Sequence, residues 1–347
     1  MAGGALAGAS LSWPLVAATA ATPDQTHRVV DANNGVGLHF VEQGAGPAVI
    51  LCHGFPECWY SWRHQLAALA GAGFRAIAPD LRGYGRSDRP DEVDRYTVLD
   101  HVSDMVGLLD ALGEDRAVIA GHDFGATVAW EAALLRPDRF RALIALGVPF
   151  RPRGFGTRVR PTSVMPQDKD AVYYQLYLQT PEARKELERD VRRTFSSLFY
   201  ALSGDRPIPA STGGVAGLAG RGMVPRTGGS VLIDPPSLPG WITKPEIDFY
   251  VDEFTRTGFG APLNWYRNID RSWELLGIGQ GATIRVPVLF IAGDRDFVVA
   301  ANQPFVERQS ALVPGLRAIM LPGCGHWTQQ ERAREVSAAM VDFLVRL

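Results

Sequence analysis

The sequence has few cysteines and no excess of charge of either sign. Its 347 residues include only three cysteines, Cys52, Cys58 and Cys324, at spacings that fit neither a zinc site nor a redox pair. We therefore assign no disulfide and no metal. The 35 Lys and Arg residues nearly balance the 37 Asp and Glu residues, so the formal net charge is -2. This balance offers no basic surface to nucleic acid and favours small neutral ligands.

The first 23 residues contain no Lys or Arg. A signal peptide normally opens with positive charge, but the apolar stretch and a cleavage-like Ala18-Thr19-Ala20 are present. Residues 1–25 are therefore either an export segment whose true start lies further upstream or a disordered tail. The protein is expected to be soluble, in the cytoplasm or exported. Pro14 and the many small residues argue against a membrane-spanning helix, so no stable membrane insertion is expected.

From residue 26 onward the chain alternates strand and helix patterns. A hairpin signal around Asn33-Asn34-Gly35 is followed by apolar runs typical of buried strands. These runs lie at residues 48–52, 74–78, 118–122, 142–146 and 286–292. The rhythm predicts an α/β fold with a mostly parallel sheet and helices on both faces. We expect residues 26–147 and 282–347 to form this core.

Residues 148–281 interrupt the rhythm. They show helical patterns without a buried strand, which predicts an inserted helical lid, or cap domain. Its clearest helix is predicted over Pro181–Leu202, with proline at the first position and one apolar face. Eight glycines between Gly204 and Gly229 predict a long loop that lines an entrance.

The stretch Gly121-His122-Asp123-Phe124-Gly125 follows an apolar run and leads into a helix pattern. The nucleophile elbow of α/β-hydrolases has this pattern with serine at its centre. A carboxylate that attacks a saturated carbon leaves an ester that water can still cleave, whereas an alkoxide would leave a stable ether. Asp123 therefore indicates carbon–oxygen or carbon–halogen bonds as substrates. By itself, an ordinary turn or N-cap aspartate is the alternative.

A nucleophile, an acid and a histidine appear in the order Asp123, then Asp294 or Asp296, then His326. Each follows a predicted strand, which is the order and placement of the α/β-hydrolase triad. The resemblance extends to further motifs, namely His53-Gly54-Phe55-Pro56-Glu57, Asp80 to Asp88, Tyr174-Gln175-Leu176-Tyr177, Pro262 to Asn268, Asp296-Phe297-Val298 and Gly325-His326-Trp327. On these residues the chain, from about Thr26 to Leu347, resembles an epoxide hydrolase of the α/β-hydrolase family.

The resemblance implies a role for each matched residue. Asp123 would be the nucleophile, His326 the base for water and Asp296 its orienting acid. Tyr174 and Tyr266 would donate hydrogen bonds to the epoxide oxygen. The backbone N–H groups of Phe55 and Phe124 would form the oxyanion hole. His53, Gly54 and Pro56 would shape the loop that carries Phe55. An apolar epoxide would become a vicinal diol through an ester on Asp123, without metal or organic cofactor.

The resemblance also predicts a pH dependence, but it leaves the substrate and the assembly open. His326 must be neutral to act as a base, so activity is expected to fall on acidification near its reference pKa of about 6.5. The natural epoxide, the selectivity and the oligomeric state, with a homodimer among the options, are not specified by the motifs.

Two alternative functions use the same fold. A haloalkane or haloacid dehalogenase has the same Asp–His–Asp triad, but Phe124 offers no polar hydrogen to a halide, and the two tyrosines serve only an oxygen leaving group. Phe124 is also a departure, because epoxide hydrolases more often have tryptophan there. A non-catalytic ligand-binding protein is the other alternative, although such a site would be expected to lose at least one reacting group.

Overall fold

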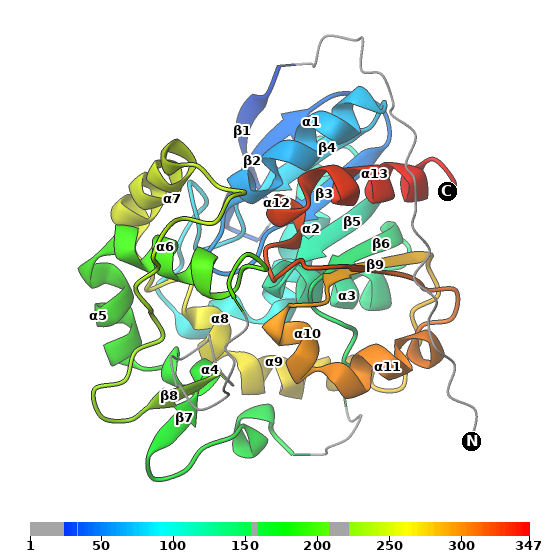
Figure 1. Cartoon of the computed structure of the whole chain (residues 1–347). Helices are drawn as coiled ribbons and strands as arrows, with labels where there is room; N and C mark the ends of the chain where they lie inside the picture. The colour runs from blue at the N-terminus through cyan, green and yellow to red at the C-terminus, as the bar shows by residue number, and fades with distance from the viewer. Residues whose placement is uncertain (1–23, 33, 154–158, 208–221) are drawn as a thin grey trace.

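The computed structural model describes residues 24–32, 34–153, 159–207 and 222–347 (Figure 1). Residues 1–23 of the predicted N-terminal segment, Asn33 of the hairpin turn and positions 208–221 of the glycine-rich loop lie outside the described residues. No helix in the described ranges combines the length and the apolar character needed to cross a membrane.

An eight-stranded sheet forms the centre of the molecule. Its strands, in spatial order, are β1 (Thr26–Asp31), β2 (Gly37–Gln43), β4 (Arg75–Pro79), β3 (Ala48–Cys52), β5 (Ala117–His122), β6 (Phe140–Leu146), β9 (Val288–Gly293) and β10 (Arg317–Leu321). Strand β2 runs antiparallel to β1 and β4, and the other neighbours are parallel. Every residue of β3, β5 and β9 is buried, which explains their continuous apolar sequences. The predicted α/β fold class is confirmed.

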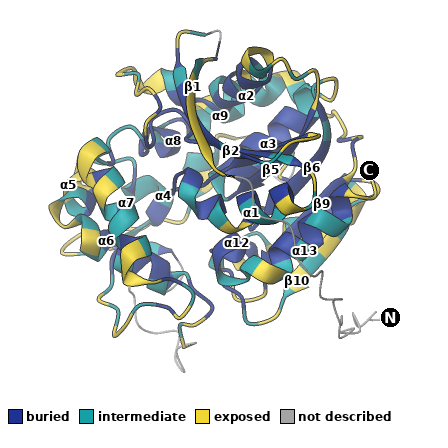
Figure 2. Cartoon of the chain, turned by 90° about the horizontal axis from the view of Figure 1, so that it is seen from above, coloured by how far each residue is buried: buried dark blue, intermediate teal, exposed yellow. Residues whose placement is uncertain are grey.

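Helices cover both faces of the sheet. In Figure 2, α1 (Arg63–Gly71) and α13 (Ala333–Leu344) lie on one face, and α2 (Val98–Leu112) and α3 (Phe124–Leu135) on the other. Two further helices, α10 (Phe297–Ala301) and α11 (Gln303–Leu312), lie between β9 and β10 in the chain, and α12 (Thr328–Glu331) precedes α13. Helix α2 begins with a capping box between Thr97 and Asp100 and ends at Gly113, whose φ is 68°.

The inserted segment, residues 148–281, connects β6 to β9. Its helices are α4 (Tyr174–Tyr177), α5 (Pro181–Arg189), α6 (Val191–Ala201), α7 (Lys244–Thr257), α8 (Asn264–Arg267) and α9 (Ile269–Leu275). Two short strands, β7 (Ala171–Tyr173) and β8 (Met223–Pro225), pair antiparallel within it, and the sequence did not predict them. Figure 1 shows α4 to α8 on one side of the molecule, beside the core.

The prediction of one helix over Pro181–Leu202 is wrong. The helix breaks at Asp190, where φ is -149° and ψ is 93°, both outside the helical region. The Asp190 side chain accepts a hydrogen bond from the Arg193 N–H at 2.9 Å. Aspartate at this position satisfies one of the free N–H groups at the start of a helix, so it begins α6 rather than continuing α5.

Candidate active site

Asp123 lies in a tight turn between β5 and α3. Its φ of 52° and ψ of -119° make it the one non-glycine residue with positive φ in the described part of the chain. A Cβ on Gly121 would lie 2.0 Å from the Gly125 carbonyl oxygen, and one on Gly125 would lie 2.2 Å from the Cys52 oxygen. Both glycines are therefore needed for close backbone approach, and the strain at Asp123, of order 1–3 kcal/mol, is typical of a functional position.

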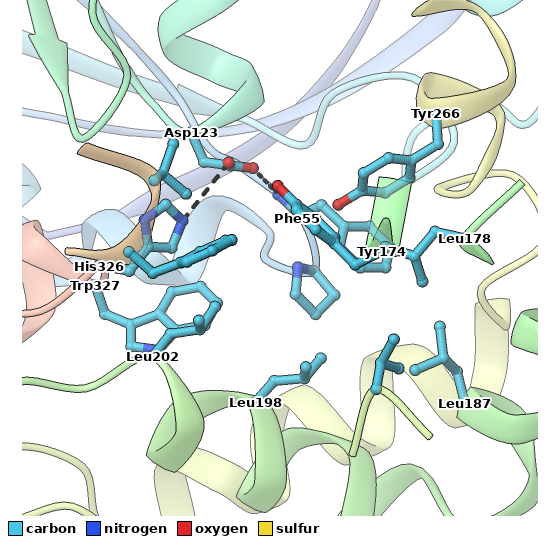
Figure 3. Close-up of a pocket in the computed structure, with 14 residues that line it drawn as sticks. Phe55, Asp123, Tyr174, Leu178, Leu187, Leu198, Leu202, Tyr266, His326 and Trp327 are labelled. Atoms are coloured by element: carbon cyan, nitrogen blue, oxygen red, sulfur yellow. Dashed lines mark hydrogen bonds and ion pairs between the residues drawn. The ribbon is translucent and has the colours of Figure 1, made fainter. Parts of the chain in front are cut away.

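His326 lies between two carboxylates. Its Nε2 is 3.5 Å from Oδ2 of Asp123, as the dashed line in Figure 3 marks. Its Nδ1 is 3.0 Å from Oδ2 of Asp296. Asp294, the other acid that the sequence left open, instead accepts the Gly323 N–H at 2.7 Å. The structure thus brings Asp296 rather than Asp294 to the histidine, in the arrangement of an acid, a base and a nucleophile.

The two carboxylates change the electrostatics of His326. Burial disfavours the charged imidazolium, but Asp296 and Asp123 outweigh it and raise the pKa of His326 well above its usual value. Burial also opposes ionisation of Asp123, yet the hydrogen bond and charge of His326 lower the pKa of Asp123. In the free protein the pKa of His326 is therefore raised above the reference value used at the sequence level, which favours an imidazolium paired with the Asp123 carboxylate.

One oxygen of Asp123 already has a backbone donor. The Phe55 N–H donates to Oδ1 at 3.0 Å, drawn as a dashed line in Figure 3. Phe124 is the first residue of α3, where the backbone N–H has no acceptor within the helix. These two N–H groups are the expected oxyanion donors, and that of Phe55 already contacts the Asp123 carboxylate.

The loop that carries Phe55 is held close to the elbow. His53 accepts the Leu81 N–H at Nε2 over 3.0 Å, so Nδ1 carries the proton and donates to the Gly54 oxygen at 2.9 Å. A Cβ on Gly54 would lie 2.5 Å from the Cβ of Asp123, which leaves no room for a side chain. The peptide before Pro56 is cis. All three predicted structural residues contact the loop or the elbow.

Tyr174 and Tyr266 come from the inserted segment and face the same space as Asp123. Tyr174 begins α4 and Tyr266 lies in α8, and their ring centroids are 6.4 Å apart. Figure 3 shows both rings pointing into the pocket that Asp123 lines. Burial, reinforced by the Asp123 charge, raises the pKa of both phenols well above 10. Both are therefore protonated and able to donate hydrogen bonds at neutral pH.

The pocket is apolar apart from these groups. Its charged members are Asp123 and His326. The other lining residues are Phe55, Pro56, Leu178, Leu187, Leu198, Leu202, Val231, Phe297, Val298 and Trp327. Within the described ranges, no cluster of His, Cys, Asp and Glu side chains has the arrangement of a metal site. The pocket suits a small neutral ligand.

A sequence profile described as alpha/beta hydrolase fold matches residues 47–333. The chain belongs to the α/β-hydrolase family. It is 45% identical over 329 residues to epoxide hydrolase A of Mycobacterium tuberculosis, covering 93% of this chain and 98% of that protein.

Solved structures of α/β-hydrolases agree with this assignment. An epoxide hydrolase from an endophytic Streptomyces matches with a TM-score of 0.85 and 42% identity over 92% of this chain and 95% of that one. Epoxide hydrolase A from Mycobacterium thermoresistibile matches with a TM-score of 0.80 and 43% identity, over 93% and 98% of the two chains. The likeness therefore extends over the core and the inserted segment together.

Sequence reasoning gave no role to a buried pair beside the α/β-hydrolase triad. Glu57 accepts a hydrogen bond from His122 Nδ1 at 2.8 Å, and His122 Nε2 lies 2.8 Å from the His326 carbonyl oxygen. The amides of Gln329 and Gln330 donate to the other Glu57 oxygen at 3.0 and 2.9 Å. Glu57 is the last residue of the motif that begins at His53, and His122 directly precedes Asp123. These positions were the only signal in the sequence for a role beside the triad.

Proposed function

We propose that this α/β-hydrolase is an epoxide hydrolase that converts an apolar epoxide and water into a vicinal diol. The observation that carries the proposal is a strained carboxylate, Asp123, across an apolar pocket from two protonated phenols, Tyr174 and Tyr266. The names of the similar proteins support it. The arrangement matches what epoxide opening requires, a nucleophile behind the carbon and acids at the oxygen.

In the first step, Asp123 attacks a ring carbon and the carbon–oxygen bond of the ring breaks. The departing oxygen takes a proton from Tyr174 or Tyr266, and the product is a hydroxyalkyl ester on Asp123. The lowered pKa of Asp123 keeps the nucleophile ionised. Two donors at the leaving oxygen stabilise the charge that develops there.

In the second step, His326 removes a proton from water, and the resulting hydroxide attacks the ester carbonyl carbon. The N–H groups of Phe55 and Phe124 stabilise the oxyanion. The bond to the diol oxygen then breaks, that oxygen takes the proton from His326, and the remaining proton of the water restores the tyrosine. Esterification removes the negative charge of Asp123, one of the two charges that raise the pKa of His326. Ester formation therefore lowers the pKa of His326, which gives its proton to solvent and becomes the neutral imidazole that can accept a proton from water. When the ester is hydrolysed, His326 takes up a proton again and pairs with the regenerated Asp123 carboxylate.

The proposal extends to the organisation of the chain. Residues 26–147 and 282–347 act as the catalytic core, and residues 148–281 act as a lid that supplies both tyrosines. The partner is a small apolar epoxide. A homodimer stays a prediction, which size-exclusion chromatography with light scattering would check.

The deciding experiment traps the ester. We expect His326→Gln to accumulate an adduct of the mass of the epoxide, measured on intact protein, because the first step does not need the base. Asp123→Asn should show no adduct, and His64→Gln, changed outside the pocket, should turn over like the wild type. A folded His326→Gln protein without adduct would contradict the mechanism.

Substrate class is tested in parallel. Terminal, styrene-type and lipid epoxides should be hydrolysed, whereas a haloalkane should release no halide. Halide release with no diol from any epoxide would identify a dehalogenase instead. Tight binding of epoxides without any turnover would identify a non-catalytic ligand-binding protein.

A further inference from the structure

The loop that carries His326 is held by its backbone N–H groups. Gly325 N–H donates to Glu331 Oε2 at 2.9 Å, and Trp327 N–H donates to Glu331 Oε1 at 3.0 Å. Between them, His326 N–H donates to the carbonyl oxygen of Leu202 at 2.8 Å. Three consecutive N–H groups around the base therefore depend on one side chain, Glu331, and on one residue of the inserted segment.

The same carboxylate also holds the inserted segment. Gly204 N–H donates to Glu331 Oε2 at 2.8 Å, so one oxygen is shared between Gly204 and Gly325. On its other side, the Gly204 carbonyl oxygen accepts from Arg295 Nη1 at 2.8 Å. A Cβ on Gly325 would lie 2.3 Å from Gly204 N, so the two backbones touch. Glu331 thus joins residues 202–204 to the His326 loop.

The side chain at 331 has to be a carboxylate for this arrangement. Each of its two oxygens accepts an N–H group, and an ionised carboxylate has acceptors only. A glutamine would direct an NH₂ group at one of these donors, leaving that donor unpaired. Burial raises the pKa of Glu331, and the three N–H donors act in the opposite direction.

The segment that Glu331 holds also lines the substrate pocket. The Leu202 side chain lines the pocket next to His326 and Trp327, as Figure 3 shows. The residue that lines the pocket is therefore also the residue whose carbonyl oxygen accepts the His326 N–H.

We propose that Glu331 is a positioning residue that couples the position of residues 202–204 against the core to the orientation of His326. The inference rests on the proposed function and goes beyond it, because it assigns Glu331 to one half of the reaction. Ester formation uses Asp123, Tyr174 and Tyr266, none of which Glu331 holds. Ester hydrolysis needs the His326 ring aligned with both water and Asp296, and small misplacements of a reacting group cost large factors in rate.

The test is Glu331→Gln, followed by rapid quenching and intact-mass measurement. The ester is expected to break down about 10-fold more slowly, with its formation within about twofold of the wild-type rate. In steady state, kcat and KM should fall together, so kcat/KM is unchanged. Glu335→Gln is the matched control, because it makes the same chemical change four residues away on a partly exposed side chain of α13.

A second variant tests the coupling from the other side. Arg295→Gln removes the other bond to Gly204, lies on the surface and leaves Glu331 intact. Like Glu331→Gln, it should slow ester breakdown more than ester formation. It also provides the test of the inference if the Glu331→Gln protein does not fold. Unchanged breakdown in either folded variant overturns the inference, as does an equal slowing of formation and breakdown. Absence of any ester in His326→Gln would instead count against the proposed function.

Discussion

Nε2 of His326 lies 3.5 Å from Oδ2 of Asp123, so the proposed base of the second step is the ion-pair partner of the nucleophile of the first. The pairing keeps Asp123 ionised and His326 protonated until the carboxylate becomes an ester. His326 thereby becomes neutral only after the ester has formed. Before that step it is protonated and cannot activate water in the pocket.

The pairing predicts two different pH profiles. kcat/KM reports the free enzyme, in which the pKa of Asp123 is below its reference value of 3.8, so it should stay flat on acidification to about pH 4. kcat reports the ester, in which His326 must be neutral, so kcat should fall at a higher pH than kcat/KM does. Profiles from about pH 4 to pH 9 check this. Parallel loss of both parameters would contradict it.

Removing the phenol groups should slow ester formation. Tyr174→Phe and Tyr266→Phe are each expected to lower kcat/KM on the order of 100-fold, and the double variant further, because fewer donors stabilise the leaving oxygen. Tyr177→Phe is the control, since its hydroxyl donates to Glu186 at 2.8 Å instead of lining the pocket. A double variant with wild-type turnover would exclude both tyrosines as acids.

The buried side chain of Glu131 is expected to lower the free energy of unfolding as pH rises. This residue of α3 is 6% exposed, and the described part of the chain gives it no hydrogen-bond or ion-pair partner. Burial raises its pKa from 4.5 to about 7, so the folded state gives up its proton less readily than the unfolded state. The contribution of Glu131 to the free energy of unfolding is complete below pH 4.5. It is lost between pH 4.5 and 7, by roughly 3 kcal/mol.

The matching experiment is urea unfolding of Glu131→Gln. The variant should be more stable than the wild type at about pH 8, and similar to it near pH 4.5. Glu307→Gln, on the exposed side of α11, should change neither value. A stability gain that does not depend on pH would show that Glu131 is not the titrating group.

Arg82 and Asp104 form a buried pair whose loss should destabilise the core. Their side chains are 1% and 0% exposed, and Arg82 donates to both oxygens of Asp104, at 2.6 and 2.5 Å. Asp104→Leu leaves the buried guanidinium with only the longer contact to the Asp100 carboxylate, at 3.5 Å, and should cost about 3 kcal/mol in the free energy of unfolding. The double variant with Arg82→Leu should recover part of that loss. Equal losses in the single and double variants would argue against an uncompensated charge.

The core and the triad could be predicted because they depend on local patterns. A parallel strand buried on both faces is a continuous apolar run, and the elbow around Asp123 needs glycines at fixed spacing. The break at Asp190 was missed because Leu187, Val191 and Phe195 keep a helical spacing of four residues through it. That periodicity is the same for one helix and for two helices that bury the same face.

Contacts distant in sequence were the other limit. Glu57 meets Gln329 and Gln330 across 272 and 273 residues of chain, and no spacing rule connects them. The chain order alone left Asp294 and Asp296 open, because both follow β9 and differ by two positions, and only the resemblance favoured Asp296. The raised pKa of His326 depends on the distances to two carboxylates, which the order of the motifs does not contain.

The Phe55 N–H bound to Oδ1 of Asp123 distinguishes the two oxygens of that carboxylate. Oδ1 is expected to become the ester carbonyl and keep its donor, so Oδ2 forms the bond to carbon and later leaves in the diol. In one turnover in ¹⁸O-labelled water, the diol should therefore carry unlabelled oxygen and the label should appear in Asp123. The protein is then a reactant that exchanges one of its own atoms with the solvent in every cycle, and the isotopic composition of one side chain records which molecules have turned over.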